Sequence, residues 1–237
     1  RIGDFGWELP NNMGSPVLDD NAAGILAVYP LMEEVTIMGF WMRLASESTS
    51  AVTGGDDFDA FGGIIDVSFD GIGSITPYFV IANVGSGVVR GNGDFAYDDS
   101  GLQADFIEQA TDAGLVTAAQ AADLRDSDST AWWIGVAAVF DMFDPFVFEG
   151  EFHYGSVATP ISEADRYGWL MAFKASYALD FMTPSIAFWY GSGMDDDNGD
   201  GDERMPFLAT AFAPTMFGFD GSYFATGGDQ IARASLN

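Results

Sequence analysis

The chain has 237 residues, of which 48% are hydrophobic and 15% aromatic, so it is long enough for one large folded domain and too apolar for a disordered one. Its 36 acidic and 8 basic residues give a formal charge of −28, which excludes nucleic acid as a partner because phosphate contacts need Lys or Arg. The absence of cysteine excludes disulfides and cysteine-ligated zinc.

Strand-length segments with a side-chain period of two recur along the chain. In 145–155, aromatic residues and glycine alternate with a set that contains Glu149, Glu151 and His153. In a strand the two sets point to opposite faces, one apolar and one charged. The pattern predicts nine strands, at 2–9, 22–29, 35–45, 61–70, 74–83, 130–140, 145–155, 166–179 and 183–192. Three further strands are predicted at 207–213, 216–224 and 231–237.

The connections between these segments alternate between short and long. The short ones, rich in Asp, Gly or Pro as hairpin turns are, lie at 30–34, 70–73, 141–144 and 180–182. The long ones hold 21 of the 36 acidic residues and lie at 46–60, 84–129, 156–165 and 193–206. In an up-and-down barrel this alternation puts all tight turns on one rim and all long loops on the other. The sequence therefore predicts an all-β fold, an antiparallel transmembrane β-barrel of about 10–12 strands in this chain.

The longest connection, 84–129, contains a predicted helix. Apolar residues recur at intervals of three and four from Leu102 to Leu124, and Gly114 divides this run. Thr117 is the expected N-cap of the second half. Two positions are compatible with the pattern: folded into the lumen as a constriction, or capping the outer mouth.

The alternation also predicts which residues line the lumen. In 35–45, the set Met38, Phe40, Met42 and Leu44 is assigned to the lipid side, which turns Arg43 inward. The outward set of strand 166–179 is Tyr167, Trp169, Met171, Phe173 and Tyr177. The inward residues of strand 130–140 are mostly small (Ala131, Gly135 and Ala137, with Trp133), which favours an open lumen. The predicted lining residues are Arg43, Asp66, Glu149, Glu151, His153, Arg166 and Lys174.

Two sets of residues have the composition of a metal-binding or catalytic site. Asp196–Gly201 fits the first half of a calcium loop, but the twelfth position holds Phe207 instead of a bidentate Glu, which favours a solvated acidic loop (195–202) over a metal site. Glu149, Glu151 and His153 share one strand face, yet the chain has one histidine and no nucleophile motif. The sequence predicts no enzyme activity, no metal and no cofactor.

Two blocks of sequence resemble a known family. The first is Gly14-Ser15-Pro16-Val17-Leu18-Asp19-Asp20-Asn21-Ala22-Ala23-Gly24, followed by a strand and Met38-Gly39-Phe40-Trp41-Met42-Arg43. The second is Phe188-Trp189-Tyr190-Gly191-Ser192-Gly193, an acidic loop, Glu203-Arg204-Met205-Pro206, and Phe217-Gly218-Phe219-Asp220-Gly221. Both are similar to the outer-membrane homotrimeric porins of sulfate-reducing deltaproteobacteria.

The resemblance implies a general diffusion porin: a homotrimer of 16-stranded barrels in the bacterial outer membrane, in contact with lipid and lipopolysaccharide, that passes ions and small hydrophilic solutes. Residues 1–237 would then form one barrel domain, incomplete at both ends. The family implies anions among the permeants, whereas the acidic residues of the long connections, on one rim of the barrel, favour cations. Two alternatives stay open: an adhesive or structural barrel without an open pore, whose acidic loops bind calcium or a surface partner, and a soluble, acidic, carbohydrate-binding sandwich.

Overall fold

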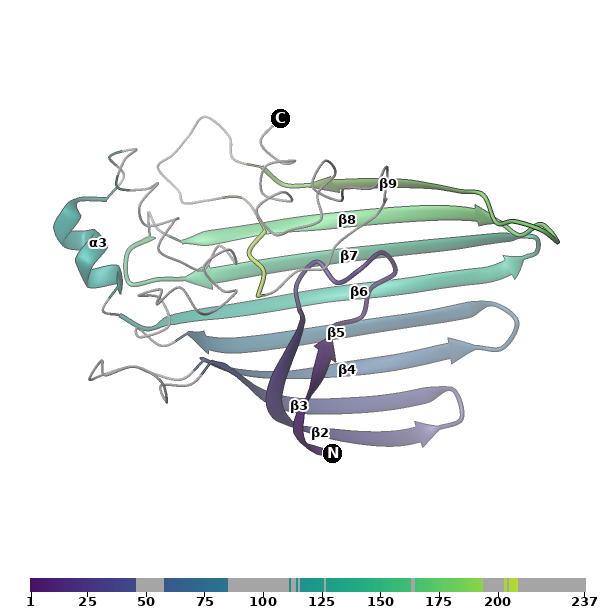
Figure 1. The fold of residues 1–237 in the computed structure, drawn as a ribbon, viewed down its shortest axis with the longest axis horizontal. Helices are drawn as coiled ribbons and strands as arrows, with labels where there is room; N and C mark the ends of the chain where they lie inside the picture. The colour runs from purple at the N-terminus through teal and green to yellow at the C-terminus, as the bar shows by residue number, and fades with distance from the viewer. Residues whose placement is uncertain are drawn as a thin grey trace.

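The structure, a computed structural model, describes most of the chain: residues 1–45, 58–84, 111, 114, 116–125, 127–162, 165–193, 203 and 205–208. Nine strands form one antiparallel sheet in which each strand pairs with the next in the chain (Figure 1). They are β1 (Ile2–Glu8), β2 (Asp19–Met32), β3 (Val35–Ala45), β4 (Phe58–Phe69), β5 (Gly73–Val84), β6 (Ser129–Phe143), β7 (Phe146–Ala158), β8 (Arg166–Tyr177) and β9 (Ser185–Gly191).

The nine principal strands predicted from the sequence are all present, so the all-β prediction is confirmed. In the described part of the chain the sheet is not closed, and β1 and β9 are its two edges. The predicted strand 207–213 is wrong where it is described, because Phe207 and Leu208 are buried but form no strand. The strands predicted at 216–224 and 231–237 lie outside the described residues.

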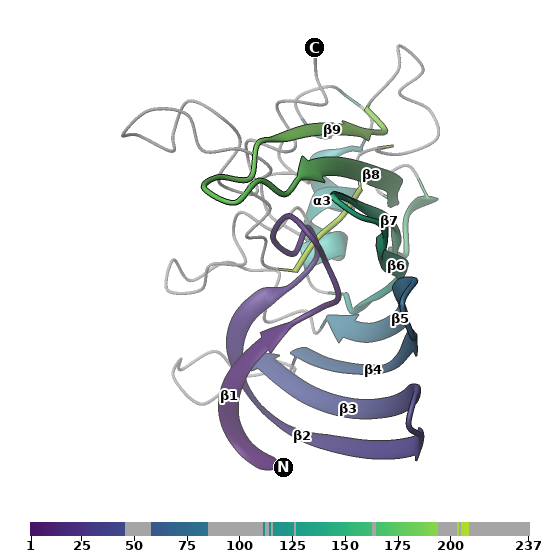
Figure 2. The same cartoon turned by 90° about the vertical axis from the view of Figure 1, so that its right-hand side faces the viewer.

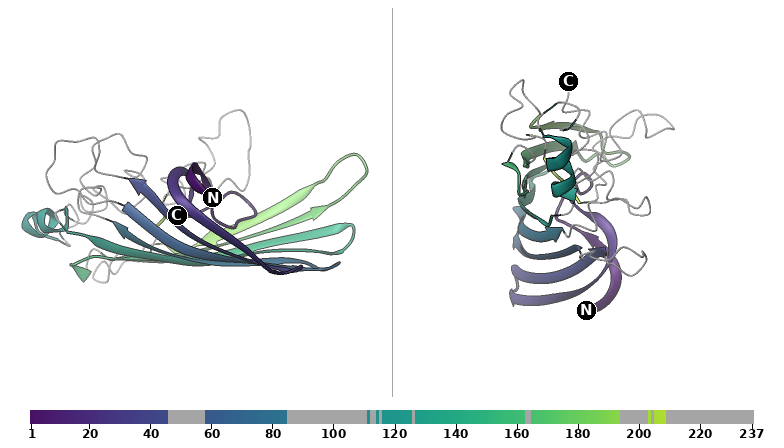
Figure 3. Two further views of the ribbon diagram at one scale, coloured as in Figure 1. Left: turned by 90° about the horizontal axis from the view of Figure 1, so that it is seen from below. Right: turned by 90° about the vertical axis from the view of Figure 1, so that its left-hand side faces the viewer.

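The sheet is strongly curved, and its two ends differ as predicted. The tight turns that join β2 to β3, β4 to β5, β6 to β7 and β8 to β9 all lie at one end (Figure 1), here called the turn rim. The described helix and the strand ends that lead into the long connections lie at the opposite end (Figure 1). Viewed along the strands the sheet is a trough, with β1 curling over one side (Figures 2 and 3).

Helix α3 (Ala118–Arg125) is the described part of the predicted helical passage. The Thr117 Oγ1 accepts a hydrogen bond of 3.3 Å from the backbone N–H of Gln120, and the Gln120 Oε1 accepts one of 2.9 Å from the backbone N–H of Thr117. This reciprocal pair is a capping box and confirms Thr117 as the N-cap. Gly114 adopts a φ of +74° just before it. No helix in the described ranges has the length and hydropathy needed to cross a membrane.

Successive side chains of each strand alternate between the convex and the concave side of the trough. The register aligns these faces: Phe61 of β4 pairs with Ile81 of β5, which pairs with Trp132 of β6, all on the convex side. Many convex side chains are large, apolar and exposed. They include Ile25, Ile37, Phe61, Ile65, Phe79, Ile81, Trp132, Ile134, Phe152, Met171, Phe173, Phe188 and Tyr190.

Two rows of aromatic side chains border this convex face. In four strands, aromatic residues stand eight positions apart, one near each end of the strand: Phe61 and Phe69, Trp132 and Phe140, Phe146 and Tyr154, and Trp169 and Tyr177. Every convex position of β4 to β8 between these rows holds an apolar residue or glycine. Eight strand residues cover about 26 Å, which at a tilt of about 35–45° corresponds to a band roughly 20 Å tall.

The concave side is divided into two halves. In the half away from the turn rim, residues 9–18, here called the inner loop, and residues 205–208 lie inside the trough (Figure 2). Their apolar side chains join a core with concave residues of the sheet. The buried members include Leu9, Met13, Val17, Leu18, Phe40, Met42, Leu44, Phe58, Val80, Trp133, Leu170, Met205 and Leu208. Near the turn rim the concave positions are mostly polar and the trough is hollow.

Gly73 begins β5 with a φ of +141°, and a Cβ there would overlap the backbone carbonyl oxygen of Val139 in β6. We expect Gly73→Ala to lower the free energy of unfolding by about 1–3 kcal/mol from the backbone conformation alone, with the overlap adding to it. Urea titration followed by tryptophan fluorescence measures the loss. Gly39→Ala, whose Cβ would meet no atom within 4 Å, is the control; equal losses in the two variants would contradict this account.

Candidate functional site

Two adjoining hollows lie on the concave side. The rim hollow, about 600 Å³, is lined by Glu33, Glu34, Ser68, Phe69, Asp70, Gly71, Gly73, Ser74, Val139 and Asp141. The inner hollow, about 510 Å³, is lined by Glu8, Leu9, Pro10, Asn11, Asn12, Met38, Ile64, Asp66, Ser74, Thr76, Ala137 and Val139. They share Ser74 and Val139, so the two hollows adjoin along the concave wall between the turn rim and the inner loop, and they are together called the passage here.

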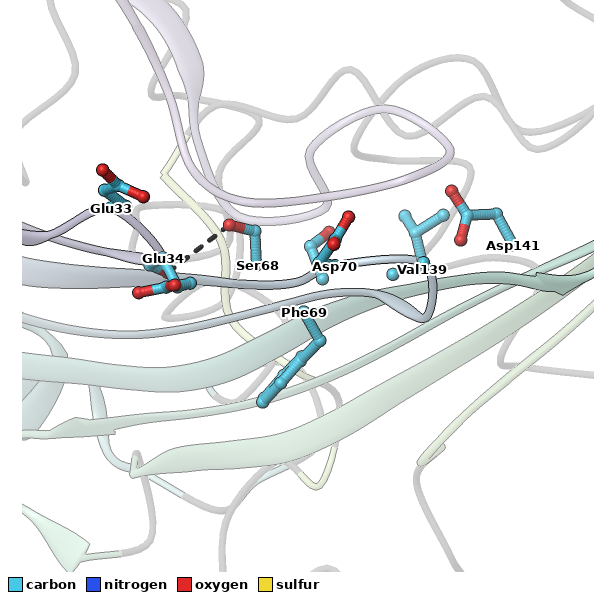
Figure 4. A pocket seen from close by; sticks show the side chains of 10 residues that line it. Glu33, Glu34, Ser68, Phe69, Asp70, Val139 and Asp141 are labelled. Atoms are coloured by element: carbon cyan, nitrogen blue, oxygen red, sulfur yellow. Dashed lines mark hydrogen bonds between the residues drawn. The ribbon is translucent and has the colours of Figure 1, made fainter.

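The rim hollow is acidic because two tight turns and the end of one strand bring carboxylates to it. Figure 4 shows Glu33 and Glu34 from the β2–β3 turn, Asp70 from the β4–β5 turn and Asp141 from β6, with Phe69 pointing away from them. Among the described residues that line the two hollows, none is basic. The two walls therefore attract cations and repel anions at low ionic strength.

Three of the predicted lining residues stand on the concave wall near this passage. Asp66 lines the inner hollow and accepts a hydrogen bond of 2.9 Å from the Thr76 hydroxyl. On β7 and β8, Lys174 Nζ lies 2.6 Å from Glu149 Oε2, and both side chains are partly exposed. This ion pair neutralises one acid of the wall, so Asp66 is the predicted residue that contributes charge directly to the hollows.

Three other predicted residues lie on the same concave face but are buried: Glu151, His153 and Arg166. The Glu151 Oε2 accepts a hydrogen bond of 2.6 Å from the backbone N–H of Asn12 in the inner loop. The His153 Nδ1 lies 2.7 Å from the Tyr78 hydroxyl. Arg166 donates to the carbonyl oxygen of Met205 at 3.4 Å. The inner loop and residues 205–208 thus cover groups that the sequence assigned to the open lumen.

The prediction for β3 is wrong. Arg43 pairs across the sheet with Asp59 on the convex side, while Phe40, Met42 and Leu44 are buried on the concave side. The Arg43 Nε and Nη2 donate to the two carboxylate oxygens of Asp59 at 2.8 and 2.7 Å. A bidentate pair near the end of a strand lies at the edge of the apolar band, where a charge is tolerated.

Asp66 and Asp70 carry the inward parity of the strand predicted at 61–70, but the sequence did not single out Glu33, Glu34 and Asp141. These three belong to segments predicted only as short connections. Asn12 lies in a loop 139 residues from its partner Glu151, so no spacing rule relates them. The alternation of short and long connections could have identified these acids, because it puts all the tight turns on one rim.

The described residues contain no group of three or more His, Asp or Glu side chains placed to hold a metal ion. The candidate calcium loop, 195–202, lies outside the described residues, as does the connection 85–110 between β5 and the helix.

The chain matches no protein-family model, no curated protein and no solved structure. Its function is therefore inferred from the geometry of its own residues.

Proposed function

We propose that this chain is part of a transmembrane β-barrel of the bacterial outer membrane that passes ions and small hydrophilic solutes, with a preference for cations. The observation that carries the proposal is the convex face: an uninterrupted apolar band between two aromatic rows, on a curved antiparallel sheet. A water-exposed sheet of this area would hold charges on that face. A band of roughly 20 Å between aromatic girdles suits lipid.

Closure of the sheet belongs to this proposal. In hydrocarbon, unpaired N–H and C=O groups at the edges β1 and β9 would be unsatisfied, and each would cost several kcal/mol. The trimer and the contact with lipopolysaccharide that the sequence resemblance implies are part of the same proposal. The mass of the detergent-solubilised protein tests the trimer: a value near 25.4 kDa would exclude it for this chain.

The cation preference follows from the acidic hollows, and it gives a direct test. In a planar bilayer with a potassium chloride gradient, we expect a reversal potential whose sign shows a higher permeability for K⁺ than for Cl⁻. We expect Asp70→Asn combined with Asp141→Asn to reduce the permeability ratio about two-fold. Near 1 M salt, where the screening length falls to about 3 Å, the difference from the unmodified protein should vanish.

A matched control is Asp123→Asn combined with Asp128→Asn, which removes two charges at the opposite end of the sheet, in and after α3. It should leave the ratio nearly unchanged. Anion preference in the unmodified protein would contradict the role given to the rim hollow, and an equal effect of the two double variants would assign selectivity to overall charge.

One observation favours a second candidate, the barrel without an open pore. The inner loop and residues 205–208 pack apolar side chains against Phe40, Met42 and Trp133 inside the trough, as a plug would. Inserted protein that never conducts would support this closed, adhesive barrel and contradict the porin proposal. Conductance in steps of three would support an open trimeric pore.

A further inference from the structure

The inner loop holds its own shape through local hydrogen bonds. The Asn11 Oδ1 accepts from the backbone N–H of Gly14 at 2.8 Å, and the Ser15 Oγ accepts from that of Leu18 at 3.1 Å. Leu9 and Leu18 close the loop with a backbone bond of 3.1 Å. Because these bonds are internal, they give the loop a shape but do not determine how far it extends across the trough.

Asn12, near the tip of the loop, makes the contact with the far wall. Its backbone N–H donates to the Glu151 Oε2 at 2.6 Å. Its side-chain Nδ2 donates to the carbonyl oxygens of Ala138 and Gly150 at 3.1 and 2.9 Å. One residue therefore joins the inner loop to both β6 and β7, at the border of the inner hollow that Asn12 also lines.

Glu151 makes this contact from a buried position. Its other oxygen, Oε1, lies 3.9 Å from His153 Nε2, and neither atom has a hydrogen-bond partner among the described residues. In the tautomer in which the Tyr78 hydroxyl donates to His153 Nδ1, the neutral imidazole carries its proton on Nε2, facing the carboxylate. Tyr78, His153 and Glu151 thus form a chain of polar groups that ends at the Asn12 amide.

A buried carboxylate is costly unless donors surround it, so the cost is offset only while Asn12 stays in place. Movement of the loop tip away from β7 would break the hydrogen bond of 2.6 Å that Glu151 accepts from the Asn12 amide.

We propose that Glu151, supported by His153 and Tyr78, is the positioning residue that holds the inner loop against β6 and β7. If the chain forms a pore, as proposed above, the same contact sets the width of the passage beside the inner hollow. The contact itself does not depend on that function.

A thiol introduced by Met13→Cys tests the contact without any need for conduction, because the chain has no other cysteine and Met13 is buried in the loop. In the folded protein we expect Glu151→Ala to make this thiol react roughly 10- to 100-fold faster with a water-soluble maleimide, the range that follows from leaving a buried donor without its partner. Asn12→Ala keeps the backbone bond to Glu151 and removes the side-chain bonds to Ala138 and Gly150, so it measures their separate contribution and should accelerate labelling less. Glu151→Gln keeps an acceptor and should restore slow labelling.

The matched control is Glu149→Ala, two positions along the same face of β7, where the carboxylate pairs with Lys174. It should leave the labelling rate unchanged. An unchanged rate in Glu151→Ala would overturn the proposal, whatever Asn12→Ala does.

Bilayer measurements then separate this inference from the proposed function. In conducting protein, Glu151→Ala should admit larger neutral polyethylene glycols than the unmodified protein, whereas Glu149→Ala should not. Absence of conductance from every variant, with accelerated labelling in Glu151→Ala, would contradict the porin proposal and support the positioning role. Conductance with unchanged glycol exclusion in Glu151→Ala would contradict the role of the contact in pore width.

Discussion

Ile65→Arg is expected to lower the free energy of unfolding in lipid vesicles by about 2–4 kcal/mol, the cost of a cationic side chain near the middle of a bilayer. Ile65 stands on the convex face of β4, midway between Phe61 and Phe69, and is 43% exposed. Because its side chain is exposed, the loss of free energy reports whether lipid or water surrounds this position. Urea titration of vesicle-reconstituted protein, followed by tryptophan fluorescence, gives the value.

The matched substitution is Thr76→Arg. Thr76 lies at a similar level on the next strand but on the concave face, where it lines the inner hollow beside Asp66. A guanidinium there gains a carboxylate neighbour in water, and the expected change is within about 1 kcal/mol. A neutral effect of Ile65→Arg, or equal costs at the two positions, would mean that the convex face meets water, and the membrane proposal would be wrong.

Trp133→Ala is expected to lower the free energy of unfolding by about 3–5 kcal/mol. Trp133 is fully buried on the concave side, and its ring lies against Gly155. Its indole N–H donates a hydrogen bond of 2.8 Å to the Pro206 carbonyl, which holds residues 205–208 inside the trough. The substitution leaves a cavity and an unpaired carbonyl together, and urea titration through the remaining tryptophans measures the loss.

Trp132 provides the control because it is the same residue type, one position away, on the convex face. It is 37% exposed, and its ring centroid lies 5.3 Å from that of Tyr154. Trp132→Ala should cost roughly 0.5–1.5 kcal/mol, the value of one aromatic pair. Losses of similar size at 132 and 133 would contradict the assignment of the two faces.

The sequence was sufficient for the strands and for the order of their connections. Alternation with a period of two is a local property, and the turns at 70–72 and 144–145 carry the Asp, Gly and Pro residues that hairpins need. The cap of α3 at Thr117 is likewise local. In β7 and β8 one face is aromatic and the other charged, so the alternation was sufficient to place Glu149, Glu151 and Lys174 together on the concave face, although Glu151 is buried there.

The sequence failed where the two faces of a strand are alike. In β3 the set Phe40, Met42 and Leu44 is as apolar as the set containing Ile37 and Trp41, so hydropathy carries no information about which side is buried. Arg43 was assigned inward because it is charged. In the structure Asp59 compensates that charge on the convex side, through a pairing that depends on the register of β3 with β4.

The sequence by itself determined the up-and-down sheet, the apolar band and the separation of tight turns from long connections, because each depends on neighbours along the chain. The tertiary structure decided what occupies the concave side. The inner loop reaches Glu151 across 139 residues, and Trp133 binds the carbonyl of Pro206 across 73. Such contacts follow from the curvature of the sheet, which brings its concave surface around the two segments, and curvature is a property of the paired strands together.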